Sequence, residues 1–296
     1  METRKLGKTG HQVTIFALGG ESAIKGEDDH DEAIEILNEA LDKGINYIDT
    51  APAYGPKTSE ERIGEIIKDG RRKEFYLATK CDKRNNEQAW KQINSSIERL
   101  GSEPDCIQIH HIDTIDEVKK IFSKNGAIKA LKRAKKEKLC KYLGITGHSD
   151  PLVLLEALGK YKFDTVLGSL NIADSFYYSF QTKLIPYCEE NDIGFIAMKT
   201  CARGNLFKKG RIYEMKDALN YVWSVPGVST AIVGISNIEQ LRANIDAAKN
   251  HKKLSEEKMR ELERMVEPYF YDALYFRKDQ SWDLHKEVEE LPQFVL

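Results

Sequence analysis

The chain has 296 residues, with 45 lysines and arginines against 47 aspartates and glutamates, and a formal net charge of −2. This near balance argues against a nucleic-acid or membrane-surface binder, which usually carries a clustered basic excess. Five widely spaced cysteines form no CxxC pair, so the sequence predicts neither a disulfide framework nor a cysteine-based metal site. Neither a signal peptide nor an apolar run of the ~20 residues that span a membrane stands out, and we expect a cytoplasmic protein.

Short apolar runs alternate with longer amphipathic stretches along the chain. Several of these runs are apolar without a break, which is typical of strands covered on both faces. We expect eight strands, at residues 15–19, 45–49, 75–79, 106–110, 142–145, 165–168, 194–198 and 230–233.

The stretches between these runs predict helices. Over residues 31–43 the apolar side chains recur at three- and four-residue spacing, and Gly44 marks the end. Thr58–Glu61 and Ser236–Glu239 match the capping-box pattern that opens a helix. We expect further helices at residues 87–100, 127–138, 152–158, 180–191, 213–224 and 237–249.

Eight such units of about 30 residues suit a closed (β/α)8 TIM barrel of the α/β class better than an open doubly wound sheet. An open dinucleotide-binding sheet would carry GxGxxG after its first strand, and the run that starts at Gly19 does not fit. Residues 4–13 read as a β-hairpin, which we expect to plug the barrel. We expect one domain over residues 1–296, with a helical and aromatic tail at 250–296 that covers the pocket.

Four titratable side chains fall at the carboxyl ends of neighbouring strands, where barrels carry their chemistry. Each alone has an ordinary structural role, but together they solve a problem: carbonyl reduction by hydride needs a proton, and a tyrosine with a pKa near 10 is too weak an acid without a nearby cation. We therefore predict Tyr54 as the acid, Lys80 and Asp49 as the groups that tune it, and His110 as the donor that polarises the substrate oxygen.

Over nearly its whole length, to about residue 249, the chain resembles the aldo-keto reductases. The run from Asp49-Thr-Ala to Tyr54-Gly is the most specific part, and residues 4–10, 78–80, 105–110 and 194–199 add to it. The resemblance implies the same catalytic set, Asp49, Tyr54, Lys80 and His110. It assigns the role to His110 rather than His111, because neighbours in a strand point to opposite faces.

The resemblance also implies NADP(H) as cofactor. Free amides at residues 236–238 would open a helix after the eighth strand, a common phosphate site in barrels, and Gly234 lets the backbone approach. Relatives that clamp a 2′-phosphate carry Lys or Arg here, whereas this segment has only Arg242 nearby, which weakens the preference for NADPH over NADH. The expected cofactor residues are Gly20, Glu21, Thr146, Asn171, Lys199, Arg203, Gly204, Gly234, Ser236, Asn237, Gln240 and Asn244.

A small carbonyl compound is the expected substrate, covered by residues 111–126 and by the region after residue 249. The tail aromatics could wall an apolar pocket, but we expect most of them to pack the tail onto the barrel: Tyr269, Phe270, Tyr271, Tyr275, Phe276, Trp282 and Phe294. Cys81 and Cys201 are expected near this pocket.

Two other functions compete with a reductase. A nucleotide-binding redox sensor or regulatory subunit would keep the cofactor residues while its catalysis is vestigial, although a pure binder has no need of Lys80 beside Tyr54. A metal-dependent hydrolase could use His110, His111 and Asp113, but three residues along one strand cannot all face one way, so we expect no metal site. The sequence identifies no protein partner.

Overall fold

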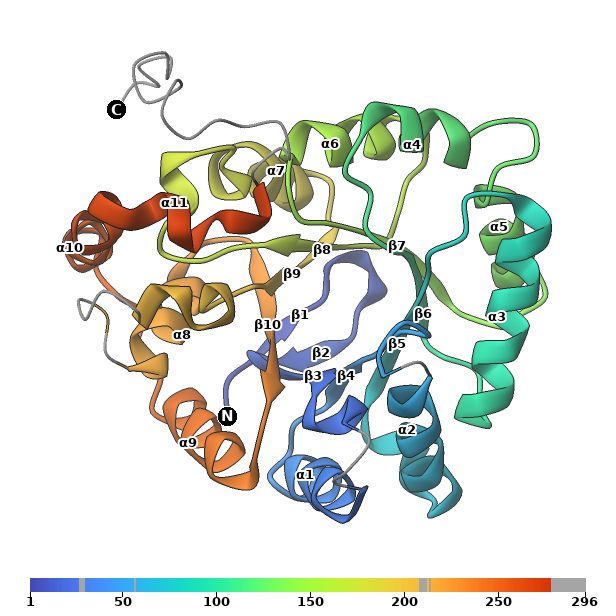
Figure 1. Cartoon of the computed structure of the whole chain (residues 1–296), viewed down its shortest axis with the longest axis horizontal. Coiled ribbons are helices and arrows are strands. Elements are labelled where there is room, and N and C mark those ends of the chain that lie inside the picture. Colours follow the sequence, from blue (N-terminus) through green and yellow to red (C-terminus); the bar gives the residue numbers. More distant parts are fainter. Residues whose placement is uncertain (27–29, 56, 208–211, 213, 278–296) are drawn as a thin grey trace.

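Eight parallel strands close into a barrel that is surrounded by helices (Figure 1). The computed structural model describes residues 1–26, 30–55, 57–207, 212 and 214–277. The barrel strands are β3 (Phe16–Ser22), β4 (Tyr47–Asp49), β5 (Tyr76–Cys81), β6 (Cys106–Ile109), β7 (Tyr142–Gly147), β8 (Thr165–Ser169), β9 (Gly194–Met198) and β10 (Val228–Ile235). They follow one another around the barrel in chain order, and β10 pairs with both β9 and β3. All eight strands expected from the sequence are confirmed, and with them the TIM-barrel fold.

Each expected helix is present, with bounds that differ by a few residues. One described helix, Ile115–Ile121, was not predicted, because seven residues are too few to show a clear period. The helices at Glu256–Val266 and Phe270–Ala273 lie in the tail that was expected to be helical, although their bounds were not predicted. The helices are α1 (His30–Asp42), α2 (Thr58–Lys68), α3 (Asn86–Leu100), α4 (Ile115–Ile121), α5 (Ile128–Lys136), α6 (Pro151–Lys160), α7 (Phe180–Glu190), α8 (Met215–Ser224), α9 (Ile238–Lys249), α10 (Glu256–Val266) and α11 (Phe270–Ala273).

Both predicted capping boxes are wrong, although the helices are there. The Thr58 hydroxyl donates back to the Gly55 carbonyl and does not cap α2. At α9 the cap is Asn237, whose side-chain oxygen accepts from the Gln240 amide at 2.9 Å. The helix therefore begins one residue later than the Ser236 pattern indicates.

A short hairpin of β1 (Thr3–Lys5) and β2 (Gln12–Thr14) lies across one end of the barrel, as predicted. Leu6 and Val13 from this hairpin join the apolar cluster inside the barrel. Gly7 has a φ of +48°, and a Cβ there would lie 2.2 Å from the Gly194 nitrogen at the start of β9. Only glycine allows the hairpin to approach the strand so closely.

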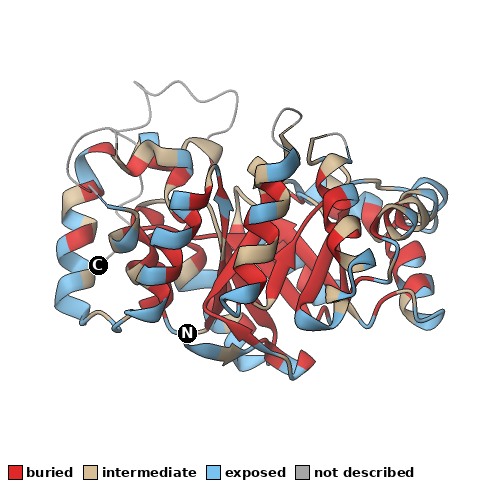
Figure 2. Ribbon diagram, turned by 90° about the horizontal axis from the view of Figure 1, so that it is seen from below, coloured by how far each residue is buried: buried red, intermediate tan, exposed pale blue. Residues whose placement is uncertain are grey.

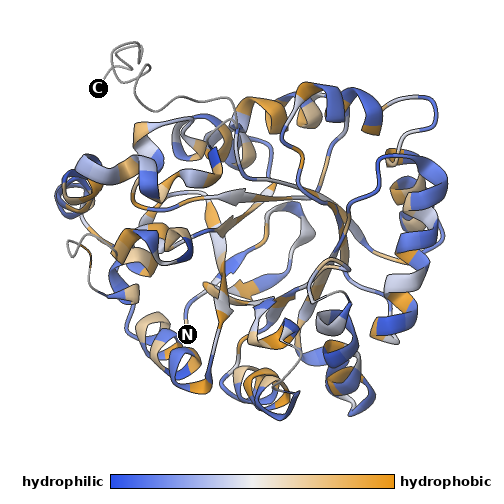
Figure 3. Ribbon diagram, in the orientation of Figure 1, coloured by the Kyte–Doolittle hydropathy of each residue, from blue (hydrophilic) through white to orange (hydrophobic). Residues whose placement is uncertain are grey.

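The barrel strands face two apolar layers, and their side chains alternate between them. In β5, Tyr76 and Ala78 point into the barrel, whereas Leu77 and Cys81 pack against the surrounding helices. Figure 2 shows buried residues concentrated in the strands and exposed residues on the outer faces of the helices, and Figure 3 shows the matching alternation of apolar and polar residues along those helices. Within the described ranges every helix is too short or too polar to span a lipid bilayer.

Candidate active site

The alternation in β5 places Lys80 inside the barrel, two residues beyond Ala78. Its side chain is 1% exposed, so its ammonium group requires partners. The Asp49 carboxylate at the end of β4 contacts it directly, and the Thr50 carbonyl accepts from it at 2.9 Å. The structure therefore brings the predicted Lys80 and Asp49 together as a buried ion pair.

Tyr54 completes this arrangement from the loop after β4. Its hydroxyl lies 3.1 Å from the Lys80 Nζ, and that nitrogen is also 4.7 Å from the centre of its ring. Gln108 in β6 was missed by the sequence reasoning, yet its Nε2 donates to the second Asp49 oxygen at 2.9 Å. Its position two residues before His110, on the inward face of β6, was the signal that could have identified it.

Burial and the Lys80–Asp49 pair set the charges at the site. Burial raises the pKa of the Tyr54 hydroxyl above its usual value of 10, and the Lys80 ammonium only partly opposes this. Although burial lowers it, the pKa of Lys80 is raised overall, because Asp49 and Tyr54 stabilise the ammonium. Tyr54 is thus protonated at neutral pH beside a charged lysine, which is the state that a proton donor requires.

His110 directly follows β6, and its ring lies edge-on to that of Tyr54, with 6.1 Å between the centroids. Its amide donates to the Cys81 carbonyl at 2.8 Å, and Arg84 donates to the His110 carbonyl at 2.9 Å. Burial, together with the Lys80 charge, lowers the pKa of His110 to about 2. The imidazole is therefore neutral at physiological pH and can donate one hydrogen bond.

His111 leaves the strand with a φ of +59°, and its ring contacts the Asp113 carboxylate. Its amide donates to the Thr146 hydroxyl at 2.7 Å. Thr146, expected to contact the cofactor, thus supports the loop that follows His110. In the part of the chain that the structure describes, no group of three His, Cys, Asp or Glu residues is placed to hold a metal ion.

The loop after β9 brings two predicted cations to the same rim. Lys199 and Arg203 have positive φ values of 59° and 52°, and Gly204 follows at 86°. Arg203 donates to the Glu21 carboxylate at 2.9 Å, and Lys25 approaches the same oxygen at 3.2 Å. Burial lowers the pKa of Lys199, and the Arg203 charge adds to this. This turn presents positive charge that fits an anionic ligand.

Two other expected cofactor residues lie in the framework of the rim. Gly20 in β3 packs so tightly that a Cβ would lie 2.4 Å from the Ser59 hydroxyl. Asn171, after β8, donates to the Lys199 carbonyl at 3.2 Å and accepts from the Ala173 amide at 2.9 Å. Its side chain therefore fixes the backbone on which Lys199 stands.

The start of α9 differs from the expectation of free amides. The Ser236 amide donates to the Gln240 side chain at 3.0 Å, and the Ile238 amide donates to the Glu32 carboxylate of α1 at 3.3 Å. Gly234 and Asn244 lie in β10 and α9 on either side of this segment. Arg242 makes two bonds to Glu39, at 2.8 and 2.7 Å. Two carboxylates of α1 thus already bind groups that a phosphate would need: Glu32 binds the Ile238 amide, and Glu39 binds the Arg242 guanidinium.

Of the two cysteines expected near the pocket, Cys81 points away from it, into the layer between barrel and helices. Burial raises its pKa to about 11, so its thiol is unreactive. In the tail, Tyr269 is buried and donates to the Leu206 carbonyl at 2.9 Å, as packing predicts. Trp282 and Phe294 lie outside the described residues.

The chain is also similar to known proteins over most of its length. A family profile described as "Aldo/keto reductase family" matches residues 16–217 and 215–267. The chain is 28% identical to the L-galactose dehydrogenase of Arabidopsis thaliana, over 90% of this chain and 95% of that protein. It is also 28% identical to the uncharacterized oxidoreductase YqkF of Bacillus subtilis, over 92% and 99% of the two chains.

Solved structures show the same fold. An aldo-keto reductase from Bacillus halodurans, in its holo form, matches with a TM-score of 0.76 and 25% identity, over 90% of this chain and 96% of that one. An aldo-keto reductase from Klebsiella pneumoniae, in complex with NADPH, matches with a TM-score of 0.75 and 20% identity, over 89% and 94%. This chain is an oxidoreductase that belongs to the aldo/keto reductase family.

Proposed function

We propose that this enzyme reduces a small aldehyde or ketone by hydride transfer from NADPH, with NADH as a second reductant, and that Tyr54 delivers the proton. The observation that carries the proposal is the 3.1 Å contact between the Tyr54 hydroxyl and the Lys80 Nζ, with the neutral His110 ring beside it. These groups form an acid, a cation and a hydrogen-bond donor at the carboxyl end of the barrel, where a carbonyl oxygen needs all three.

Each side chain has a distinct part in the reaction. A bound nicotinamide supplies the hydride to the carbonyl carbon. As charge develops on the carbonyl oxygen, the proton moves from Tyr54 to it, and the Lys80 ammonium stabilises the phenolate that remains. Asp49 and the Thr50 carbonyl hold that ammonium in place. The His110 imidazole donates to the same oxygen and stays neutral throughout.

The donor set of the rim fits the pyrophosphate of a dinucleotide. Lys199 and Arg203 lie with Lys25 around the single Glu21 carboxylate, so positive charge remains in excess there, and cations are the usual partners of phosphate oxygens. Discrimination between NADPH and NADH would be weak, because Arg242 is already paired with Glu39 and the Glu32 carboxylate occupies an amide of α9. Structures of relatives that hold NADPH support the same class of cofactor.

We also propose that residues 1–296 act as one domain whose C-terminal part borders the pocket, and that the protein works in the cytoplasm. In support of the first, the loop after β9 packs against α11 and receives the Tyr269 hydrogen bond. In support of the second, all five cysteines are free thiols, as a reducing compartment favours.

The test is to follow absorbance of NADPH, and separately NADH, with a panel of aliphatic and aromatic aldehydes and ketones, and to quantify the alcohol formed. The proposal predicts stoichiometric conversion of dinucleotide and carbonyl. Tight binding of both dinucleotides without turnover of any panel member would contradict it and would favour a nucleotide sensor.

A further inference from the structure

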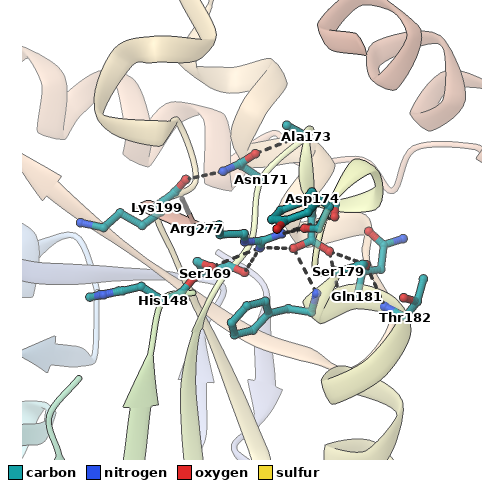
Figure 4. A network of polar contacts seen from close by, with 12 residues as sticks. His148, Ser169, Asn171, Ala173, Asp174, Ser179, Gln181, Thr182, Lys199 and Arg277 are labelled. Carbon is teal, nitrogen blue, oxygen red and sulfur yellow. Dashed lines mark hydrogen bonds and ion pairs between the residues drawn. The ribbon is translucent and has the colours of Figure 1, made fainter. Parts of the chain in front are cut away.

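Arg277, in a short helical turn near the C-terminus, has a guanidinium group that the structure buries completely. It pairs with the Asp174 carboxylate, whose side chain is also fully buried. It donates to the Tyr177 carbonyl at 2.6 Å and to the Ser169 hydroxyl and carbonyl, both at 3.1 Å (Figure 4). Phe180 lies under its plane at 4.8 Å. Burying such a pair adds little stability over apolar packing, so its use here points to a need for fixed geometry.

The partners of Arg277 come from the end of β8 and from the connection to α7. The Asp174 carboxylate also accepts from the Ser179 hydroxyl at 2.7 Å and from the Gln181 amide at 2.9 Å, at the start of α7. One ion pair therefore joins the C-terminal segment, the end of a barrel strand and the helix that follows it.

The same network reaches side chains of the rim. The Ser169 hydroxyl, which accepts from Arg277, donates to the His148 carbonyl at 2.8 Å, and Ser149 donates to the Phe276 carbonyl at 3.1 Å. Asn171, two residues beyond Ser169, holds the Lys199 carbonyl. Figure 4 shows the side chains of His148 and Lys199 extending to the same side, away from Arg277.

His148 in turn lies against the catalytic strand end. Its ring meets that of His111 edge-on, with 4.6 Å between centroids, and His111 follows His110. The His148 amide donates to the Asp113 carboxylate at 3.3 Å. A shift of the His148 backbone would therefore move the wall beside His110, whereas Lys80 lies in β5 and Tyr54 in the loop that follows β4.

We propose that Arg277 is a positioning residue of this site: through Ser169 and Asp174 it fixes the backbone at His148 and Lys199, and so sets the affinity for the dinucleotide and the carbonyl. It takes no part in proton transfer. The proposal rests on the reductase function proposed above, and it assigns to the C-terminal segment a role beyond packing.

Arg72 provides a matched control. It too joins a carboxylate, Asp105 at 2.8 Å, to backbone carbonyls, those of Phe75 and Glu103, both at 2.9 Å. These contacts lie at the amino ends of β5 and β6, opposite to the site. Replacing Arg72, whose side chain is 23% exposed whereas that of Arg277 is buried, thus removes a similar set of hydrogen bonds without touching the rim.

The experiment measures the dinucleotide Kd by fluorescence, and the carbonyl KM and kcat, for Arg277→Met, Arg277→Lys, Ser169→Ala and Arg72→Met. We expect Arg277→Met to raise Kd and KM about tenfold or more with kcat changed by less than about threefold. Arg277→Lys should show a smaller rise in Kd and KM than Arg277→Met. Ser169→Ala keeps the ion pair, and therefore the fold, and should raise KM to a smaller extent. Arg72→Met should lower the melting temperature only.

A second readout needs no ligand. NMR titration of the histidine rings between about pH 8 and pH 5 should show His148 neutral throughout in the wild type and protonated at a higher pH in the Arg277 and Ser169 variants, because burial and the His111 charge lower its pKa only while the loop is fixed. If the protein binds no dinucleotide, the proposed function fails, and this titration alone then shows whether Arg277 positions the His148 backbone. Unchanged Kd, KM and His148 pKa, with a loss of thermal stability like that of Arg72→Met, would overturn the positioning role.

Discussion

The Tyr54 hydroxyl lies 3.1 Å from the Lys80 ammonium, and Lys80 is itself bound to Asp49 inside the barrel. This relationship separates two tasks. In the proposed mechanism the buried pair provides the charge that a departing proton requires, and Lys199 and Arg203 would provide the charge that a dinucleotide requires.

Replacing Lys80 with Met should lower kcat by about 10²–10³-fold, because the phenolate of Tyr54 would form without its cation. The dinucleotide Kd should change little, since the partners of the Lys80 ammonium are Asp49, Thr50 and Tyr54, in β4 and the loop that follows it. Lys199→Met is the control: it should raise Kd and affect kcat less. Stopped-flow kinetics and equilibrium titration measure kcat and Kd. If the two variants change kcat and Kd to the same extent, Lys80 and Lys199 do not have separate roles.

Asp49→Asn should destabilise the protein by about 3–5 kcal/mol, because Lys80 would remain buried without its anion. Urea unfolding monitored by circular dichroism gives the free energy of unfolding. The control is Asp192→Asn, which removes a surface partner of Lys5 that is more than half exposed, and which should cost less than about 1 kcal/mol. An equal loss of unfolding free energy in the two variants would show that the buried Lys80–Asp49 pair stabilises the fold no more than a surface ion pair does.

The barrel, and the meeting of Asp49, Tyr54 and Lys80 at one end of it, could be predicted from the sequence because both depend on local patterns. Alternation within a strand places Lys80 inside, and strand ends collect Asp49 and His110 on one rim. The missed contacts join distant residues. Glu32 reaches the Ile238 amide, and Arg277 reaches Asp174, only after the barrel has closed, and neither pairing leaves a period or a motif in the sequence.

The partner of the Ile238 amide leads to a prediction on cofactor choice. The Glu32 carboxylate should repel a 2′-phosphate at the start of α9, so Glu32→Gln should favour NADPH over NADH by about fivefold, which corresponds to about 1 kcal/mol. Fluorescence titration with both dinucleotides measures the ratio of Kd values. Glu35→Gln, on an exposed face of the same helix, should leave the ratio unchanged. If the ratio of Kd values for NADPH and NADH in Glu32→Gln equals that of the wild type, the 2′-phosphate does not bind at the start of α9.

Neutral histidines at the site should make stability depend on pH. Burial lowers the pKa values of His110 to about 2 and of His148 to about 3. In the unfolded chain both rings bind a proton below about pH 6.5, so the folded state loses stability as the pH falls below that value. Each ring contributes up to about 1.4 kcal/mol per pH unit, and the raised pKa of His111 opposes part of this.

Urea unfolding between about pH 7 and pH 5 tests this dependence, with His148→Gln beside the wild type. The variant should lose less stability on acidification, because one neutral ring has been removed. A free energy of unfolding that falls more steeply on acidification in His148→Gln than in the wild type would contradict this prediction.

The most direct measurement is the carbonyl reduction rate of Tyr54→Phe, with Tyr178→Phe as the control on an exposed tyrosine. The phenyl ring keeps the packing beside Lys80 and His110 but has no proton to give. We expect kcat/KM for Tyr54→Phe to fall by about 10³-fold while the dinucleotide Kd stays within about twofold of the wild type. A Tyr54→Phe enzyme that reduces carbonyls as fast as the wild type would remove this tyrosine from the chemistry.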